Sequence, residues 1–169
     1  MKTRRILCYI FLVLSVAINV FIVVEGGING DNSASQSFSF TQMFIDLVKK
    51  IDPNSPIVQN PEITHSVIRK LVGHFGLFGV SGILTTTMLS LIDDAYKDKK
   101  LQIVISSAFI GLFVAFLSEL MQLFTPGRYM SFIDVLIDYS GYILFGGLTF
   151  LIFYLAYHHK KKKEVETAN

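Results

Sequence analysis

Four long apolar segments follow one another along the chain, at residues 6–24, 71–92, 101–117 and 135–157. The first three contain no Asp, Glu, Lys or Arg, and the fourth contains only Asp138. As α-helices, which rise about 1.5 Å per residue, these segments are long enough to cross a hydrocarbon core of about 30 Å. The pattern predicts an all-α, multi-pass protein of the cell membrane with four transmembrane helices.

A shorter amphipathic pattern lies between the first two apolar segments. Apolar side chains recur there on one face of a predicted helix, at Phe40, Met43, Phe44, Leu47, Val48 and Ile51. Ser39 is the predicted N-cap, Gln42 completes a capping box, and Asp52 before a proline ends the helix. Such a helix either lies on the outer leaflet of the membrane or packs against the transmembrane bundle.

The connecting segments carry their own signals. Residues 26–33 are rich in glycine and small polar side chains, which predicts a flexible linker. Asn60 followed by Pro61 is typical of a helix start, so the second transmembrane helix is predicted to begin outside the membrane and to enter it without a break. Residues 93–100 are predicted to form a short polar hairpin.

Lysine and arginine residues are unequally divided between the two sides of a four-span topology. With the N-terminus in the cytoplasm, ten of them lie inside and five outside. The positive-inside rule therefore predicts that both termini are cytoplasmic and that the amphipathic helix is extracytoplasmic. Residues 1–24 could instead be a cleaved signal peptide, but their apolar core is long and no A-x-A pattern follows, which favours a retained helix.

Composition excludes several classes of protein. Only 17% of the residues are charged, and too little chain remains outside the membrane to form a soluble enzyme domain. The net charge of +2 is accounted for by the basic tail, so no nucleic-acid partner is expected. Cys8 is the single cysteine, which excludes an intrachain disulfide. The sequence contains no HExxH, P-loop or GxGxxG motif, so neither a metal nor a cofactor is expected.

Ionisable and polar residues gather near the predicted outer ends of three helices. Spacings of three or four residues place each of three pairs on one helical face, and a short loop adds an arginine. The candidate ligand-binding residues are Lys70, His74, Glu119, Gln122, Arg128, Asp134 and Asp138. Because unpaired carboxylates are costly at a bilayer edge, they are predicted to face Arg128, Lys70 or His74. The cluster is either an ion-pair clamp that holds the helices or a working site.

Glycines form stripes on two of the predicted helices. They lie at Gly73, Gly76, Gly79 and Gly82 on one, and at Gly141, Gly146 and Gly147 on the other. Small residues at this spacing allow another helix to approach closely, either within the chain or in a homo-oligomer.

Two sequence blocks resemble the VanZ-like family of small bacterial membrane proteins. The first reads Lys70-x-x-x-His74-Phe75-x-x-Phe78. The second reads Ser118-Glu119-x-x-Gln122-x-Phe124-x-x-x-Arg128-x-x-Ser131-x-x-Asp134-x-x-x-Asp138-x-x-Gly141. The resemblance covers about residues 69–150 and is carried mainly by the second block.

The hydropathy pattern divides the chain into four parts, and the resemblance applies to the third. The parts are an N-terminal transmembrane helix or uncleaved signal anchor at 1–24, an extracytoplasmic linker with the amphipathic helix at 25–68, a VanZ-like domain of three transmembrane helices at 69–157, and a basic cytoplasmic tail at 158–169. The resemblance implies a link to resistance against teicoplanin and related glycopeptide or lipoglycopeptide antibiotics in Gram-positive bacteria. The residues that match the family pattern are His74, Glu119, Gln122, Arg128, Asp134 and Gly141. Position 138 departs from that pattern, because many relatives have Asn where this chain has Asp138.

Two functions from different classes remain open. In the first, the outer cluster acts on membrane lipids or lipid-linked envelope precursors, with Arg128 holding a phosphate or carboxylate. Glu119 and His74 are then the candidate general acid and base if a reaction occurs, and whether the protein is an enzyme stays open. In the second, the protein is a structural or regulatory subunit without catalysis, which recruits a partner through its amphipathic helix.

Overall fold

The computed structural model describes residues 2–28, 30–92 and 99–168, and the burial of their side chains except at 30–36 and 168. These residues form helices and connecting turns without a strand. The helices are α1 (Lys2–Gly26), α2 (Gly30–Ile51), α3 (Pro56–Gln59), α4 (Pro61–Ile68), the π-helical η1 (Arg69–Gly76), α5 (Leu77–Ser90), α7 (Lys100–Gln122) and α8 (Phe132–Ala168).

Four helical stretches are long and apolar enough to cross a membrane, which confirms the predicted spans. They are Lys2–Gly26, Pro61–Ser90, Lys100–Gln122 and Phe132–Thr167. The first, third and fourth correspond to α1, α7 and α8, and the second joins α4, η1 and α5. The predicted unbroken entry of the second span is present, although its middle turns are π-helical. The predicted polar hairpin at 93–100 falls largely outside the described residues.

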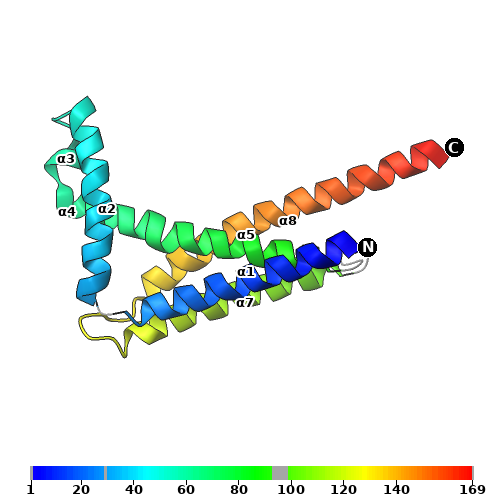
Figure 1. The fold of residues 1–169 in the computed structure, drawn as a ribbon, viewed down its shortest axis with the longest axis horizontal. Helices are drawn as coiled ribbons and strands as arrows, with labels where there is room; N and C mark the ends of the chain where they lie inside the picture. Colours follow the sequence, from blue (N-terminus) through cyan, green and yellow to red (C-terminus); the bar gives the residue numbers. More distant parts are fainter. Residues whose placement is uncertain (1, 29, 93–98, 169) are drawn as a thin grey trace.

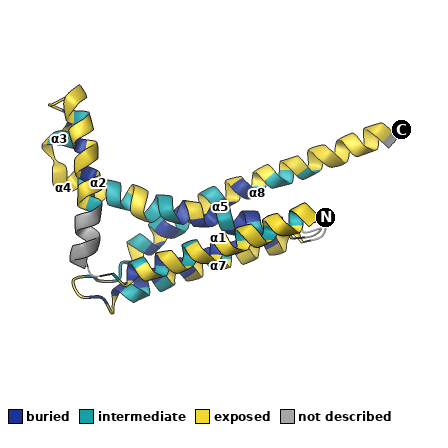
Figure 2. Ribbon diagram, viewed as in Figure 1, coloured by how far each residue is buried: buried dark blue, intermediate teal, exposed yellow. Residues whose placement is uncertain are grey.

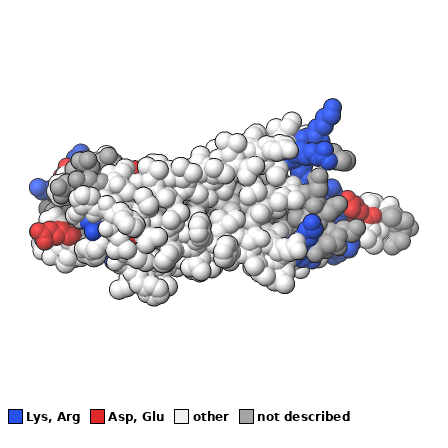
Figure 3. All heavy atoms as spheres, turned by 90° about the horizontal axis from the view of Figure 1, so that it is seen from below, with Lys and Arg blue, Asp and Glu red and all other residues white. Residues whose placement is uncertain are grey.

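The spanning helices form one bundle with two different ends. In Figure 1 both termini lie at one end, and α2 lies across the opposite end. Large apolar side chains such as Phe109 and Phe113 are exposed around the bundle, and Figure 2 shows exposed residues along its outer faces. Lys, Arg, Asp and Glu gather at the two ends in Figure 3, with a band free of them between. An apolar exterior between polar ends fits a lipid environment.

Glycines allow the helices to touch through their backbones. A β-carbon at Gly82 would collide with the carbonyl of Tyr142, and one at Gly141 would collide with the carbonyl of Phe75. Both contacts join α8 to the second span. Part of each predicted glycine stripe therefore serves packing within the chain, while a β-carbon at Gly73 or Gly147 would meet no atom within 4 Å.

Polar side chains tie α1 into the bundle. The Ser15 and Thr85 hydroxyls are 2.7 Å apart, and the Ser81 hydroxyl donates to Asn19 over 2.7 Å. At the other end of α1, Ser118 donates to the carbonyl of Ile22. These bonds join α1 to both α5 and α7.

Helix α2 begins earlier than predicted. It starts at Gly30, so Ser39 lies inside it rather than at its N-cap, and the predicted linker at 26–33 is helical from residue 30 onward. Residues 31–40 contain neither Gly nor Pro, so nothing stops a helix that propagates from the amphipathic part.

The side of α2 that packs is also not the predicted apolar face. Its buried residues are Thr41 and Ile45, and the helix contacts α3 and α4. The predicted apolar side chains are mostly exposed, from 39% at Phe44 to 87% at Ile51. Only Phe40 of this face lines a cavity together with residues of the transmembrane bundle. The rest of the face stays available to a lipid surface or a partner.

Candidate functional site

Two ion pairs connect the π-helix η1 to the beginning of α8. The Lys70 ammonium lies 3.1 Å from a carboxylate oxygen of Asp134, and the Nδ1 of His74 lies 3.0 Å from a carboxylate oxygen of Asp138. Lys70 and His74, predicted to share one helical face, thus pair one to one with Asp134 and Asp138 on the facing helix. Asp138 is fully buried, whereas the Lys70 side chain is 45% exposed.

A second carboxylate joins the inner pair from α7. Glu119 is fully buried and accepts hydrogen bonds from the backbone N–H of Ser131, over 3.0 Å, and from the side-chain amide of Gln122. Potential ligand atoms of His74, Glu119 and Asp138 all lie within 4.8 Å of one another. We call these three residues the buried cluster. Three separate segments of the chain, η1, α7 and α8, therefore converge on one point.

Ser131 fixes this geometry at the start of α8. Its hydroxyl accepts from the backbone N–H of Asp134 over 3.2 Å, which is the bond made by an N-cap residue. Its own N–H is the donor to Glu119. One residue therefore both begins α8 and orients the carboxylate, while Asp134 lies in the first turn, where the helix dipole favours a negative charge.

Of the three residues predicted to face the carboxylates, Lys70 and His74 form ion pairs with them, and Arg128 forms none among the described residues. Its guanidinium donates to the backbone carbonyls of Glu25, over 2.9 Å, and Ile28, over 3.3 Å. The reason is that the last carbonyls of a helix have no partner within it, so the end of α1 attracts a cation. The tight turn before Arg128 uses Gly127 at φ +74°, a conformation that favours glycine. Within the described chain, the buried Nε of Arg128 has no hydrogen-bond partner.

A cavity of about 320 Å³ opens beside these residues. Three of the predicted site residues line it, namely His74, Gln122 and Arg128. Its walls are largely apolar, including Phe21, Phe40, Val72, Leu77 and Phe78. Glu119 and Asp138 lie behind His74 and Gln122 rather than on the wall, and the Lys70–Asp134 pair is separate from it. We call this space the arginine cavity because two arginines line it.

The second arginine, Arg69, was missed as a site residue by the sequence analysis. In an α-helix it would lie apart from His74, but in a π-helix the backbone bonds join residues five apart and so align these two positions. The two arginines also affect each other. Burial lowers the pKa of Arg128, the positive charge of Arg69 lowers it further, and Glu119 and Glu25 oppose both effects. An anion between the two guanidinium groups would relieve their repulsion.

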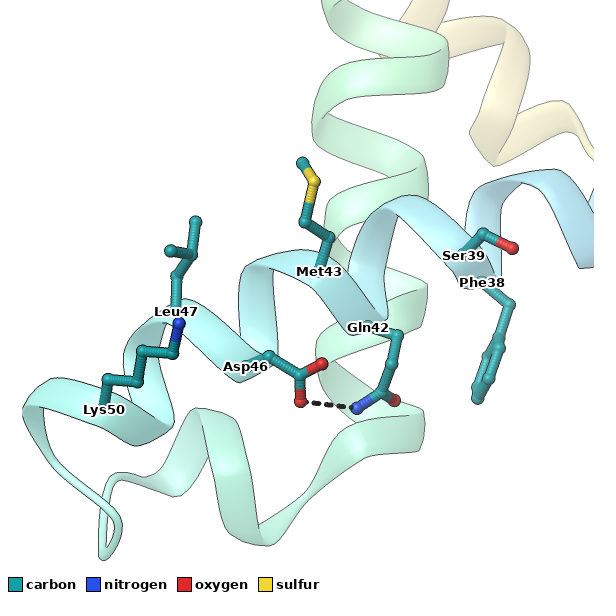
Figure 4. A pocket seen from close by; sticks show the side chains of 7 residues that line it. All are labelled: Phe38, Ser39, Gln42, Met43, Asp46, Leu47 and Lys50. Atoms are coloured by element: carbon teal, nitrogen blue, oxygen red, sulfur yellow. Dashed lines mark hydrogen bonds between the residues drawn. The ribbon is translucent and has the colours of Figure 1, made fainter.

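A wider hollow of about 480 Å³ runs along α2 and does not have the character of a site. Figure 4 shows that its lining comes from this helix alone: Phe38, Ser39, Gln42, Met43, Asp46, Leu47 and Lys50. One bond crosses it, from the Gln42 amide to the Asp46 carboxylate over 3.0 Å. A hollow with one wall cannot enclose a ligand, and it contains none of the predicted site residues.

The fold and the site together define a class of protein. A four-span bundle with charged residues buried at one end is a small multi-pass membrane protein with a polar site at that end of its bundle. The chain belongs to the VanZ/LLP1 family, whose profile matches residues 7–155. The match is wider than the expected 69–150 and includes most of α1 and all of α2. No curated protein and no solved structure matches the chain.

Proposed function

We propose that this VanZ-like protein acts on an anionic, lipid-linked component of the cell envelope at the outer face of the membrane. The first support is orientation. Of the fourteen Lys and Arg residues that the structure describes, nine lie at the end of the bundle that holds both termini, which is typical of the cytoplasmic side. The arginine cavity and α2 then lie on the extracytoplasmic side.

The arginine cavity is the observation that carries the proposal. It combines two arginines, Arg69 and Arg128, with one acidic residue, Glu25, and largely apolar walls. The excess of positive charge beside apolar surface suits a molecule with an anionic head and an apolar tail. Guanidinium groups bind phosphate and carboxylate oxygens by paired hydrogen bonds. The buried Nε of Arg128 is a donor that still needs an acceptor, and a bound anion would supply one.

The buried cluster adds the means for a reaction. His74 reaches both the cavity and the carboxylate of Asp138, so it is placed to accept a proton from a bound molecule. Glu119 would then stabilise the positive charge on the ring. A change in an envelope component of this kind would alter antibiotic access, and resistance to teicoplanin-type glycopeptides or lipoglycopeptides is the phenotype that the family resemblance suggests.

The test is antibiotic susceptibility in a sensitive Gram-positive host. We expect wild type to protect the host against a teicoplanin-type lipoglycopeptide, and the Arg69→Gln variant to lose protection at normal membrane abundance. Lys49→Gln is the matched control, because Lys49 is an exposed cation on α2 away from the cavity. Full protection by a normally abundant Arg69→Gln protein would contradict the proposed role of the cavity.

The exposed apolar face of α2 favours a second candidate function. Met43 and Leu47 are 57% and 52% exposed on the extracytoplasmic helix, and such a face suits a partner protein. In this reading the chain is a structural or regulatory subunit without catalysis. Met43→Ser with Leu47→Ser should then abolish the phenotype while Arg69→Gln leaves it intact. Glu119→Gln should lower membrane abundance here, but remove only the phenotype under the first proposal.

A further inference from the structure

We propose that the buried cluster of His74, Glu119 and Asp138 is a binding site for a divalent metal ion, with Zn²⁺ the best fit. One ligand atom from each residue lies within 4.8 Å of the other two. The His74 nitrogen and Asp138 oxygen are already 3.0 Å apart. Ligands about 2.0–2.1 Å from a tetrahedral zinc ion are about 3.4 Å from each other, so small side-chain rotations would let all three reach one ion.

An unpartnered carboxylate oxygen points independently to a ligand. Asp138 is fully buried, and its Oδ2 has no hydrogen-bond partner among the described residues. Its other oxygen contacts His74. A buried oxygen without a donor is costly unless something satisfies it, and a cation in the cluster would do so.

The charges around the cluster lead to the same conclusion. Two fully buried carboxylates lie close together, yet in the described part of the chain neither forms an ion pair with a lysine or an arginine. The nearby Lys70 pairs with Asp134, and Arg128 donates to carbonyl groups. A divalent ion bound by two carboxylates and one neutral histidine would make the site electrically neutral.

The donor set selects the kind of metal. One imidazole nitrogen and two carboxylate oxygens suit Zn²⁺ better than Ca²⁺ or Mg²⁺, which prefer oxygen ligands alone. Three protein ligands leave a fourth position open, as catalytic zinc sites do. The donors to Glu119, from Ser131 and Gln122, hold its carboxylate in place, a role that supporting groups fill at metal sites. A bound zinc ion could polarise a phosphoryl or carbonyl group of a molecule in the arginine cavity.

This inference deepens the proposed function. The role of the ion toward a molecule in the arginine cavity rests on the proposed function, whereas the binding of the ion does not. Metal binding itself is measured with Zn²⁺ alone, without any envelope component or antibiotic. A failure to bind zinc would leave the proposed function standing without a metal. A loss of the resistance phenotype would leave the metal measurement unaffected.

The experiment measures zinc in the purified full-length protein in lipid nanodiscs. After incubation with Zn²⁺ and removal of the excess, we expect about one ion per chain by elemental mass spectrometry, with Co²⁺ giving the visible absorption of a tetrahedral site. Asp138→Asn should weaken zinc affinity by about tenfold or more. Asp134→Asn is the matched control, because it changes an aspartate one turn away on the same helix and should retain the metal.

A second control addresses adventitious binding to the tail. His158 and His159 are adjacent and exposed, so they are the competing zinc ligands. The double variant His158→Gln with His159→Gln should retain one zinc per chain, and loss of zinc there would overturn the proposal. Substoichiometric zinc in wild type, or unchanged affinity in both Asp138→Asn and His74→Gln, would also overturn it. If Asp138→Asn does not fold, the wild-type stoichiometry and the Co²⁺ spectrum decide.

Discussion

The two ion pairs between η1 and α8 have nearly the same length and very different surroundings. Lys70 and Asp134 approach to 3.1 Å, with side chains that are 45% and 20% exposed. His74 and Asp138 approach to 3.0 Å one turn further in, with side chains that are 14% and 0% exposed. Distance alone would rank them as equal. Because water competes for exposed charges and not for buried ones, the inner pair has far more effect on stability when one partner is removed.

The difference in burial also determines which of the two pairs can take part in a functional site. The outer pair does not line the arginine cavity and holds two helices together. The inner pair borders the arginine cavity through His74 and contacts a second buried carboxylate, Glu119. Burying an ionisable side chain within a membrane protein is costly, so its presence there indicates a functional site. The same kind of substitution should therefore change the free energy of unfolding by different amounts in the two pairs.

The largest expected effect is the removal of the histidine from the inner pair. His74→Leu leaves Asp138 buried without its partner, and the free energy of unfolding should fall by about 3–5 kcal/mol. Chemical denaturation of the protein in detergent, followed by circular dichroism, would measure it. Lys70→Leu is the matched control and should cost no more than about 1 kcal/mol. Equal losses in the two variants would show that burial does not distinguish the pairs.

The next effect concerns the close helix contact that brings both pairs together. A β-carbon at Gly141 would meet the backbone carbonyl of Phe75, the residue after His74, so Gly141→Ala should push η1 away from α8. We expect a loss of about 1–3 kcal/mol in the same denaturation assay. Gly147→Ala lies on the same helix in open space and should change little. A Gly141→Ala protein that is as stable as wild type and keeps both ion pairs would contradict this prediction, because the two helices would then accommodate the added β-carbon.

Much of this fold could be predicted from hydropathy alone. A charge-free run of about twenty residues has few alternatives to a membrane-spanning helix, so all four spans appear where expected. The extent of α2 could not be predicted, since glycine and serine content lowers helix propensity but does not forbid helix once a neighbouring turn exists. The composition of a segment predicts whether a helix forms there better than it predicts where that helix begins and ends.

The sequence predicted most residues of the site, but not the presence of Arg69 or the partners of Arg128. Spacing of four residues placed Lys70 with His74 and Asp134 with Asp138, and these faces do meet. The role of Arg128 was missed because its acceptors are backbone carbonyls, which leave no mark in a sequence. Arg69 was missed because a π-helix changes which residues share a face. Both errors arise where the backbone, rather than side-chain type, determines the contact.

The smallest expected effect is also the most specific one for the outer pair. Lys70→Gln removes a half-exposed ion pair and should lower the free energy of unfolding by less than about 1 kcal/mol. At about 1 M salt the screening length falls to about 3 Å, so the difference from wild type should vanish. The loss caused by His74→Leu should persist at the same salt concentration, because ions do not reach a buried carboxylate. If salt removed both differences, Asp138 would have to be accessible to solvent, and the contrast between the pairs would fail.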